Sequence, residues 1–143
     1  MPILIDLSKV LQEEGQTTIQ TIAANVWRNK QNATGTAINS LNETVTSNTL
    51  TIKAVDYFPN LESGTKPGTY VSSKAINTWA NAKGYWQGDN FRANTISRRI
   101  FNSGSLLFRK GGRKDVYTNE IQPLINRILE RVGKEVVNIK LIE

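Results

Sequence analysis

The sequence predicts an α+β fold: a small antiparallel sheet packed against several amphipathic helices, with apolar arms at the N- and C-terminal ends. Three observations carry this prediction. Several segments repeat apolar residues at helical spacing, a pair of short segments alternates apolar and polar residues as strands do, and glycine, proline and asparagine punctuate the intervals. With 143 residues, 38% of them hydrophobic and 21% charged, the chain fits a single folded domain over residues 1–143.

The N-terminal segment, residues 1–14, fits a short helix or an extended arm, and we expect an arm. It opens with an apolar cluster and is interrupted by Gly15. The cluster consists of Ile3, Leu4, Ile5 and Leu7. Chain ends are loose unless they are docked, so large aliphatic side chains here indicate that the arm packs on its own domain or on a neighbouring molecule.

An amphipathic helix is expected from Thr17 to about Asn32. Thr17 and Gln20 match a capping box, which marks a helix start. Apolar residues then recur at helical spacing at Ile19, Ile22, Ala23, Val26 and Trp27. We expect this face to be buried, and Trp27 to belong to the core rather than to a ligand-stacking site.

A β-hairpin is expected after a break at residues 33–35 and a short helical turn over residues 36–41. Residues 43–46 and 50–54 are rich in β-branched side chains and alternate in polarity, with Leu50, Ile52 and Ala54 on one face. Ser47 and Asn48 provide the turn. Residues 55–61 are expected to continue the second strand after a bend.

Two further helices are predicted between residues 72 and 102. Ser72 or Ser73 caps the first, and Lys83-Gly84 ends it. Its predicted inner face is Ala75, Ile76, Trp79 and Ala80. The second, roughly Asn90 to Asn102, is expected to bury Ala93, Ile96 and Ile100 and to turn its arginines outward.

The last helix is predicted over an aliphatic run that contains Pro123 and ends at Gly133. The residues in register are Ile121, Leu124, Ile125, Ile128, Leu129 and Val132. Beyond it, Val137, Ile139 and Leu141 alternate with polar neighbours, so residues 134–143 are predicted to form a strand-like tail.

The composition excludes most common enzyme chemistries. Without Cys or His the chain has no Ser–His or Cys–His pair, no usual zinc site and no disulfide. What remains for an enzyme is a carboxylate and Lys site that holds a divalent metal, as nucleases use, but the twelve acids are scattered and only Glu13 and Glu14 are adjacent. We therefore expect no enzyme, and no catalytic, cofactor or metal site. No apolar run has membrane-spanning length, which predicts no membrane partner and a cytoplasmic origin.

The net charge of +6 is concentrated in one segment, Gly88 to Lys114, which holds a single acid, Asp89. Its bases are Arg92, Arg98, Arg99, Arg109, Lys110, Arg113 and Lys114. Such a segment predicts an acidic or phosphate-bearing partner. The alternative is a solvated helix face followed by a soluble loop, and the sequence favours neither.

The segment YFPNLESGTKPG, Tyr57 to Gly68, is expected to be an ordered loop. Pro59 and Pro67 fix φ, whereas Gly64 and Gly68 permit positive φ, so the chain turns at defined places. Tyr57 and Phe58 then serve either as core aromatics or as anchors for a neighbouring subunit.

The order of motifs over about residues 17–132 resembles the tail-completion, or neck, family of bacteriophage head-tail connectors. The matched positions fall in four groups: Thr34, Gly35 and Ile38 or Leu41; Tyr57, Phe58, Glu62, Gly64, Thr65 and Pro67; Trp79, Ala80, Lys83 and Gly84; and Ala93, Ile96, Arg98, Arg99 and Ile100. An inserted Ser63 displaces Glu62, and the basic run LLFRKGGRKDVYT replaces the family's usual P-F-x-x-P-A run. The Asn- and Thr-rich composition is similar to that of a neck-ring protein of a crAss-like phage.

The resemblance implies a non-enzymatic virion structural protein, assembled in the host cytoplasm. It implies a homo-oligomeric ring, hexameric or dodecameric, that joins the portal or adaptor to the tail around the DNA channel. The basic residues named above then face a partner or contact genomic double-stranded DNA non-specifically. The implied subunit interface comprises Ile3, Leu4, Ile5, Leu7, Tyr57, Phe58, Pro59, Pro67, Val137, Ile139 and Leu141.

A small basic nucleic-acid-binding protein is the alternative. Tyr85, Trp86 and Phe91 are interleaved with the basic segment and are able to stack on bases.

Overall fold

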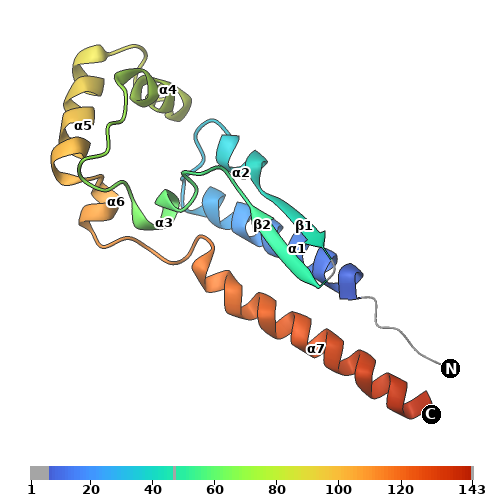
Figure 1. Cartoon of the computed structure of the whole chain (residues 1–143). Helices are drawn as coiled ribbons and strands as arrows, with labels where there is room; N and C mark the ends of the chain where they lie inside the picture. Colours follow the sequence, from blue (N-terminus) through green and yellow to red (C-terminus); the bar gives the residue numbers. More distant parts are fainter. Residues whose placement is uncertain (1–6, 47, 143) are drawn as a thin grey trace.

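The computed structural model describes residues 7–46 and 48–142, and the side chains of these residues as far as Gly133. The predicted α+β class is confirmed: a two-stranded antiparallel sheet packs with helices in an elongated molecule (Figure 1). The elements are α1 (Leu7–Arg28), α2 (Thr36–Ser40), β1 (Asn42–Thr46), β2 (Thr49–Lys53), α3 (Asn60–Ser63), α4 (Ser73–Lys83), α5 (Asn90–Ser103), α6 (Leu106–Arg109) and α7 (Thr118–Ile142).

The first helix, α1, corrects the predicted arm and the predicted capping box. It begins at Leu7 and runs through Gly15, and the Thr17 hydroxyl donates to the Glu13 carbonyl oxygen at 3.1 Å inside the helix. Gly15 is buried, and a Cβ there would lie 2.9 Å from Leu50 Cδ1 of the hairpin. Glycine here permits a close approach of the sheet rather than a helix end. Ile3, Leu4 and Ile5 lie outside the described residues.

The β-hairpin is confirmed. β1 and β2 pair antiparallel, with Val45 opposite Leu50 and Glu43 opposite Ile52. Along each strand exposed and half-buried residues alternate, so Leu50 and Ile52 face α1 while Thr51 and Lys53 face outward. Ala54 follows β2 and is exposed, and Ser47 lies outside the described residues.

The predicted continuation of β2 through residues 55–61 is wrong. The Phe58 N–H donates to the Val55 carbonyl at 3.0 Å, and the Asn60 N–H donates to Tyr57 at 2.9 Å, so the chain turns and enters α3. Pro59 lacks the N–H that a strand ladder needs, which favours this turn. The turn carries Phe58 into the core, where it packs with Ile22, Val26 and Val116.

Trp27 is 63% exposed, which overturns its predicted place in the core. The phase of α1 is set by residues that face the hairpin and α7, and Trp27 is one position beyond this face. The buried residues of α1 are Val10, Leu11, Gly15, Thr18, Ile22, Asn25 and Val26. The five apolar residues between Ile19 and Trp27 are too few to determine which side of the helix is buried.

Helices α4 and α5 lie where the sequence predicts them and pack against each other. Ser72 Oγ accepts from the Ala75 N–H at 3.1 Å, and Gly84 ends α4 in the left-handed region at φ 77°. Ala75 and Trp79, predicted on the inner face, are exposed, because only one edge of α4 faces α5. The buried residues of the two helices are Ile76, Ala80, Ala93 and Ser97, and Ile96 and Ile100 are half-buried.

The last helix, α7, passes through Gly133 and continues to Ile142, so both its predicted end and the strand-like tail are wrong. The backbone of residues 134–142 is helical, and the side chains of Val137, Ile139 and Leu141 lie outside the described set. Glycine costs a helix interior only about 1 kcal/mol relative to alanine. Gly133 does not have a positive φ, so it forms no left-handed cap here.

Polar contacts hold α7 antiparallel to α1. Arg127 Nε lies 2.7 Å from Glu14 Oε2, and Arg127 Nη2 donates to Thr18 Oγ1 at 2.8 Å. Arg131 reaches Glu14 at 3.3 Å and Glu13 at 3.4 Å. Hydrogen bonding to Arg127 lowers the pKa of the Glu14 carboxyl, although partial burial opposes this.

We predict that Arg127→Gln lowers the free energy of unfolding by about 1–2 kcal/mol near neutral pH, because Glu14 keeps its charge without its main partner. The folded pKa of Glu14 lies below its ordinary value of 4.5. The pair therefore stabilises the fold above that value and loses its effect as pH falls through the lowered pKa. Urea titrations near pH 7 and pH 3 should show the difference between variant and wild type shrinking in acid. Arg98→Gln, at an exposed side chain without a side-chain partner among the described residues, is the control and should change stability by less than about 0.5 kcal/mol.

Candidate interaction site

The ordered loop at residues 57–68 has the carboxylate of Glu62 as its centre. Glu62 is 6% exposed, and its Oε2 accepts from the N–H groups of Val116, Tyr117 and Thr118 at 3.2, 2.9 and 2.9 Å. The Thr118 hydroxyl donates to Oε1. Glu62 thus caps the N-terminus of α7 from a segment more than fifty residues away. A carboxylate at this position also interacts favourably with the positive end of the helix dipole.

Two glycines allow this close approach. Gly64 has φ 75°, and a Cβ there would lie 2.3 Å from the Phe108 backbone nitrogen. Gly112 has φ 80°, and its Cβ would lie 2.8 Å from the Glu62 carbonyl oxygen, which accepts from Arg113 N–H at 2.8 Å. No other residue fits either position without moving the backbone.

The second half of the loop is bonded to the end of α5 and the start of α6. Thr65 and Ser105 exchange two hydrogen bonds, Thr65 N–H to Ser105 Oγ and Ser105 N–H to the Thr65 carbonyl, both 2.9 Å. Gly68 N–H donates to the Phe101 carbonyl at 2.7 Å. The loop therefore joins the α1–hairpin–α7 part of the molecule to the α4–α5 part.

The structure corrects part of the predicted subunit interface. Phe58 is 5% exposed and fills the chain's own core, so it is not available to a neighbour. Tyr57, Pro59 and Pro67 are exposed, and Leu7 is half-buried at the start of α1. The other predicted interface residues lie outside the described side chains: Ile3, Leu4, Ile5, Val137, Ile139 and Leu141.

The basic segment divides into engaged and unengaged side chains. Arg92 pairs with Asp89 at 3.3 Å and lies 5.6 Å from the Trp86 ring centroid. Arg113 pairs with Asp115 through contacts of 2.5 and 2.8 Å, which lowers the pKa of Asp115 and raises that of Arg113. Arg109 donates to the Gly104 carbonyl at 3.3 Å. Within the described part of the chain, four bases of this segment have no side-chain partner: Arg98, Arg99, Lys110 and Lys114.

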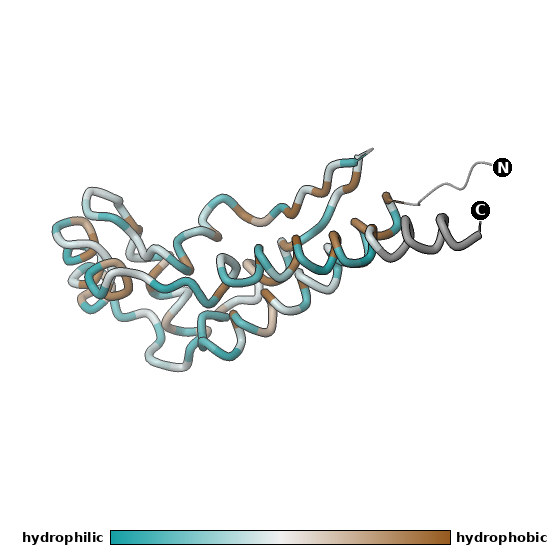
Figure 2. Tube along the Cα trace, turned by 90° about the horizontal axis from the view of Figure 1, so that it is seen from below, coloured by the Kyte–Doolittle hydropathy of each residue, from teal (hydrophilic) through white to brown (hydrophobic). Residues whose placement is uncertain are grey.

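An apolar surface runs along α7 and into a groove beside it. Ile121, Ile125 and Leu129 are 50, 42 and 64% exposed and share one face of the helix. The groove, about 460 Å³, lies over α1 between β2 and α7. Its lining consists of Thr18, Ile22, Leu41, Ile52, Ala54, Val55, Asp56, Phe58, Pro59, Tyr117, Ile121 and Leu124. Figure 2 shows apolar positions recurring along the long helices.

Exposed aromatic side chains also lie on α5 and on the connection between α4 and α5. Tyr85, Phe91 and Phe101 are 60, 82 and 49% exposed. Trp79 contacts Tyr85 and Trp86 edge-on, with ring centroids 5.2 and 6.4 Å apart. Figure 1 places α4 and α5 at the end of the molecule away from the start of α1 and the end of α7.

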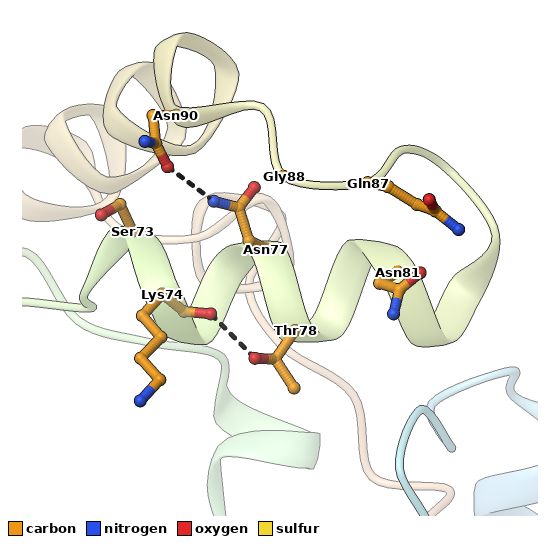
Figure 3. A pocket seen from close by; sticks show the side chains of 8 residues that line it. All are labelled: Ser73, Lys74, Asn77, Thr78, Asn81, Gln87, Gly88 and Asn90. Atoms are coloured by element: carbon orange, nitrogen blue, oxygen red, sulfur yellow. Dashed lines mark hydrogen bonds between the residues drawn. The ribbon is translucent and has the colours of Figure 1, made fainter.

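A polar hollow on α4 has a structural role (Figure 3). Asn77 donates to Asn90 Oδ1 at 3.0 Å and accepts from Trp86 Nε1 at 2.9 Å, so its amide fixes the α4–α5 connection. Among the described residues, no group of three or more carboxylate, thiol or imidazole side chains is placed to hold a metal ion. No described helix combines the length and apolar character needed to cross a membrane.

No protein-family model, curated protein or solved structure matches this chain.

We predict that Glu62→Ala destabilises the fold by about 3–5 kcal/mol, because one buried and three part-buried donors are left without their acceptor at once. Glu62→Gln keeps one acceptor oxygen and the side-chain shape, and should cost less. Glu43→Gln is the matched control, since Glu43 accepts one exposed hydrogen bond from Gln16. Denaturant unfolding followed by circular dichroism measures all three variants. Equal stability of Glu62→Ala and Glu43→Gln would contradict the capping role.

Proposed function

We propose that this protein is a non-enzymatic structural subunit of a ring in a bacteriophage neck, between the portal or adaptor and the tail. The observation that carries the proposal is the exposure of large apolar side chains at two separate places, along α7 beside its groove and on the α4–α5 part of the molecule. Exposed apolar patches on a folded chain mark contact with other proteins. Two unlike patches suit head-to-tail contacts, which generate rings when the rotation closes.

The resemblance to tail-completion proteins specifies where such a ring works. The most distinctive matched segment, residues 57–68, is also the segment that joins the two ends of the molecule through Glu62, Gly64 and Thr65. A rigid link between two contact surfaces fixes the angle between successive subunits, and this angle determines ring size. The neck location rests on the resemblance alone.

We predict that Ile125→Glu abolishes ring formation. Ile125 lies between Ile121 and Leu129 on the exposed apolar face of α7, and a charge there cannot be buried in a contact without a partner. Asn126→Glu is the matched control: it places the same charge one position round the helix, on an exposed residue off the stripe. Mass photometry of the protein with its portal or adaptor and tail partners measures the mass of the complex. We expect this mass to increase by that of six or twelve chains with the wild type and the control, and not with Ile125→Glu. A wild-type protein that stays monomeric on its partners would overturn the proposal.

Nucleic-acid binding is the second candidate function, and α5 favours it specifically. Arg98 and Arg99 are exposed without partners among the described residues, and Phe91 is 82% exposed on the same helix. Cationic side chains beside an exposed aromatic ring suit contact with phosphates and stacked bases.

We predict that Arg98→Gln/Arg99→Gln reduces the slope of log binding constant against log salt by about 2 for double-stranded DNA, because two phosphates are no longer neutralised. Fluorescence anisotropy with a labelled duplex measures the slope. Arg113→Gln/Asp115→Asn is the control, because it removes a pair that is already neutralised. Wild-type binding that is absent at low salt would remove this candidate without touching the ring proposal.

A further inference from the structure

The groove over α1 is lined by Ile52 of β2 and by the chain that follows this strand. β2 pairs only with β1 in the described sheet, so its other edge carries unpaired backbone donors and acceptors. Residues of β2 and of the chain just after it, Ile52, Ala54 and Val55, form one wall, and Ile121 and Leu124 of α7 form the other. The floor is Thr18 and Ile22 of α1. An extended segment laid here would add to the sheet and bury apolar side chains against α1.

The chain contains one apolar segment that no described element uses, residues 2–5, with the sequence Pro-Ile-Leu-Ile. In an extended conformation Ile3 and Ile5 point to the same side and Leu4 to the other. Two isoleucines on one side suit a half-buried strand, since β-branched side chains favour strands. An apolar groove beside an open strand edge is a fitting receptor for this segment.

The segment of the same chain cannot reach the Ile22–Phe58 end of the groove. Ile5 and Ile3 precede Leu7 by two and four residues, so they reach at most about 7 and 14 Å from it. Thr18 and Ile22 lie eleven and fifteen residues along α1 from Leu7, or about 16 and 22 Å. Only the hairpin-turn end of β2 is within reach, and the Ile22–Phe58 end of the groove is not.

We propose that residues 2–5 of an adjacent copy of this chain insert into the groove as a third strand on the free edge of β2, with Ile3 and Ile5 facing Ile22. The inference deepens the proposed function, because it rests on self-association and names the segment and the receptor of one contact. It assigns the groove an occupant from the neighbouring subunit. A donor segment and a receptor groove at different places on each copy make a head-to-tail contact.

Disulfide trapping tests this directly, because the natural chain has no Cys. Ile3→Cys and Ala54→Cys are purified separately, mixed under assembly conditions and oxidised. Ala54 is exposed at the lip of the groove, so its replacement leaves the core intact. We expect a covalent species of about twice the 16.0 kDa chain, and mass spectrometry should identify the disulfide-linked peptide pair that joins the two substituted positions. Asp56→Cys, at the same lip, repeats the measurement.

Two matched controls separate insertion from random collision of a chain end. Thr51→Cys lies on β2 but on its outward face, and Leu4→Cys lies in the donor segment but on its other side. We expect at least a tenfold lower yield for Ile3→Cys with Thr51→Cys, and for Leu4→Cys with Ala54→Cys. Equal yields, or no linked peptide pair in an assembled oligomer, would overturn the insertion.

The double variant Ile3→Cys/Ala54→Cys distinguishes the neighbour from the same chain. A fast-migrating monomer with an internal disulfide would overturn insertion between copies. A ring without the linked peptide pair defeats this inference and leaves the neck-ring proposal standing. Cross-linked dimers or open chains that never close, even on the portal or adaptor, support the inference and defeat the neck ring.

Discussion

The cap that Glu62 places on α7 is the interaction on which the rest of the structure depends. Three consecutive N–H groups at the start of a long helix converge on one buried carboxylate oxygen. That contact fixes where α7 begins, and the Arg127–Glu14 pair then fixes its direction along α1. With both ends of the contact defined, α7 forms one wall of the groove and exposes the Ile121–Leu129 stripe. The hydrophobic cluster of Phe58 with Ile22, Val26 and Val116 would by itself hold this arrangement loosely.

Local signals predict the elements that depend on neighbours in sequence. The Ser72 cap, the Gly84 end of α4, the α5 helix and the β1–β2 hairpin all use side chains within a few residues, and each lies where the sequence predicts it. Gly15 and Gly133 indicate helix ends in the sequence alone, because glycine usually punctuates helices. Gly15 instead admits the Leu50 side chain at close range, a reason that exists only once the hairpin has folded onto α1.

The candidate site is predictable only in part, for the same reason. The residues of the motif around Glu62 can be recognised in the sequence. The capping role of Glu62, however, requires the start of α7 to lie beside it, and the spacing of residues in a sequence does not predict a contact across more than fifty residues. From the sequence, Phe58 fits equally well as a core residue and as an anchor for a neighbouring subunit. The turn at Pro59 places its side chain in the core. The basic segment looks like one block in the sequence, whereas Asp89 and Asp115, at its two ends, each engage one of its arginines.

The antiparallel contact between α1 and α7 joins the two extremes of the described chain, with Glu14 and Arg127 separated by 113 residues. During synthesis α1 leaves the ribosome first, and Arg127 of α7 follows about one hundred residues after the end of α1. At about 5–20 residues per second, α1 waits roughly 5–20 s with its α7-facing side uncovered. The loop-closure cost of so distant a contact also slows its formation after release. Newly made chains therefore pass through a period in which their own apolar faces are free to meet those of other chains.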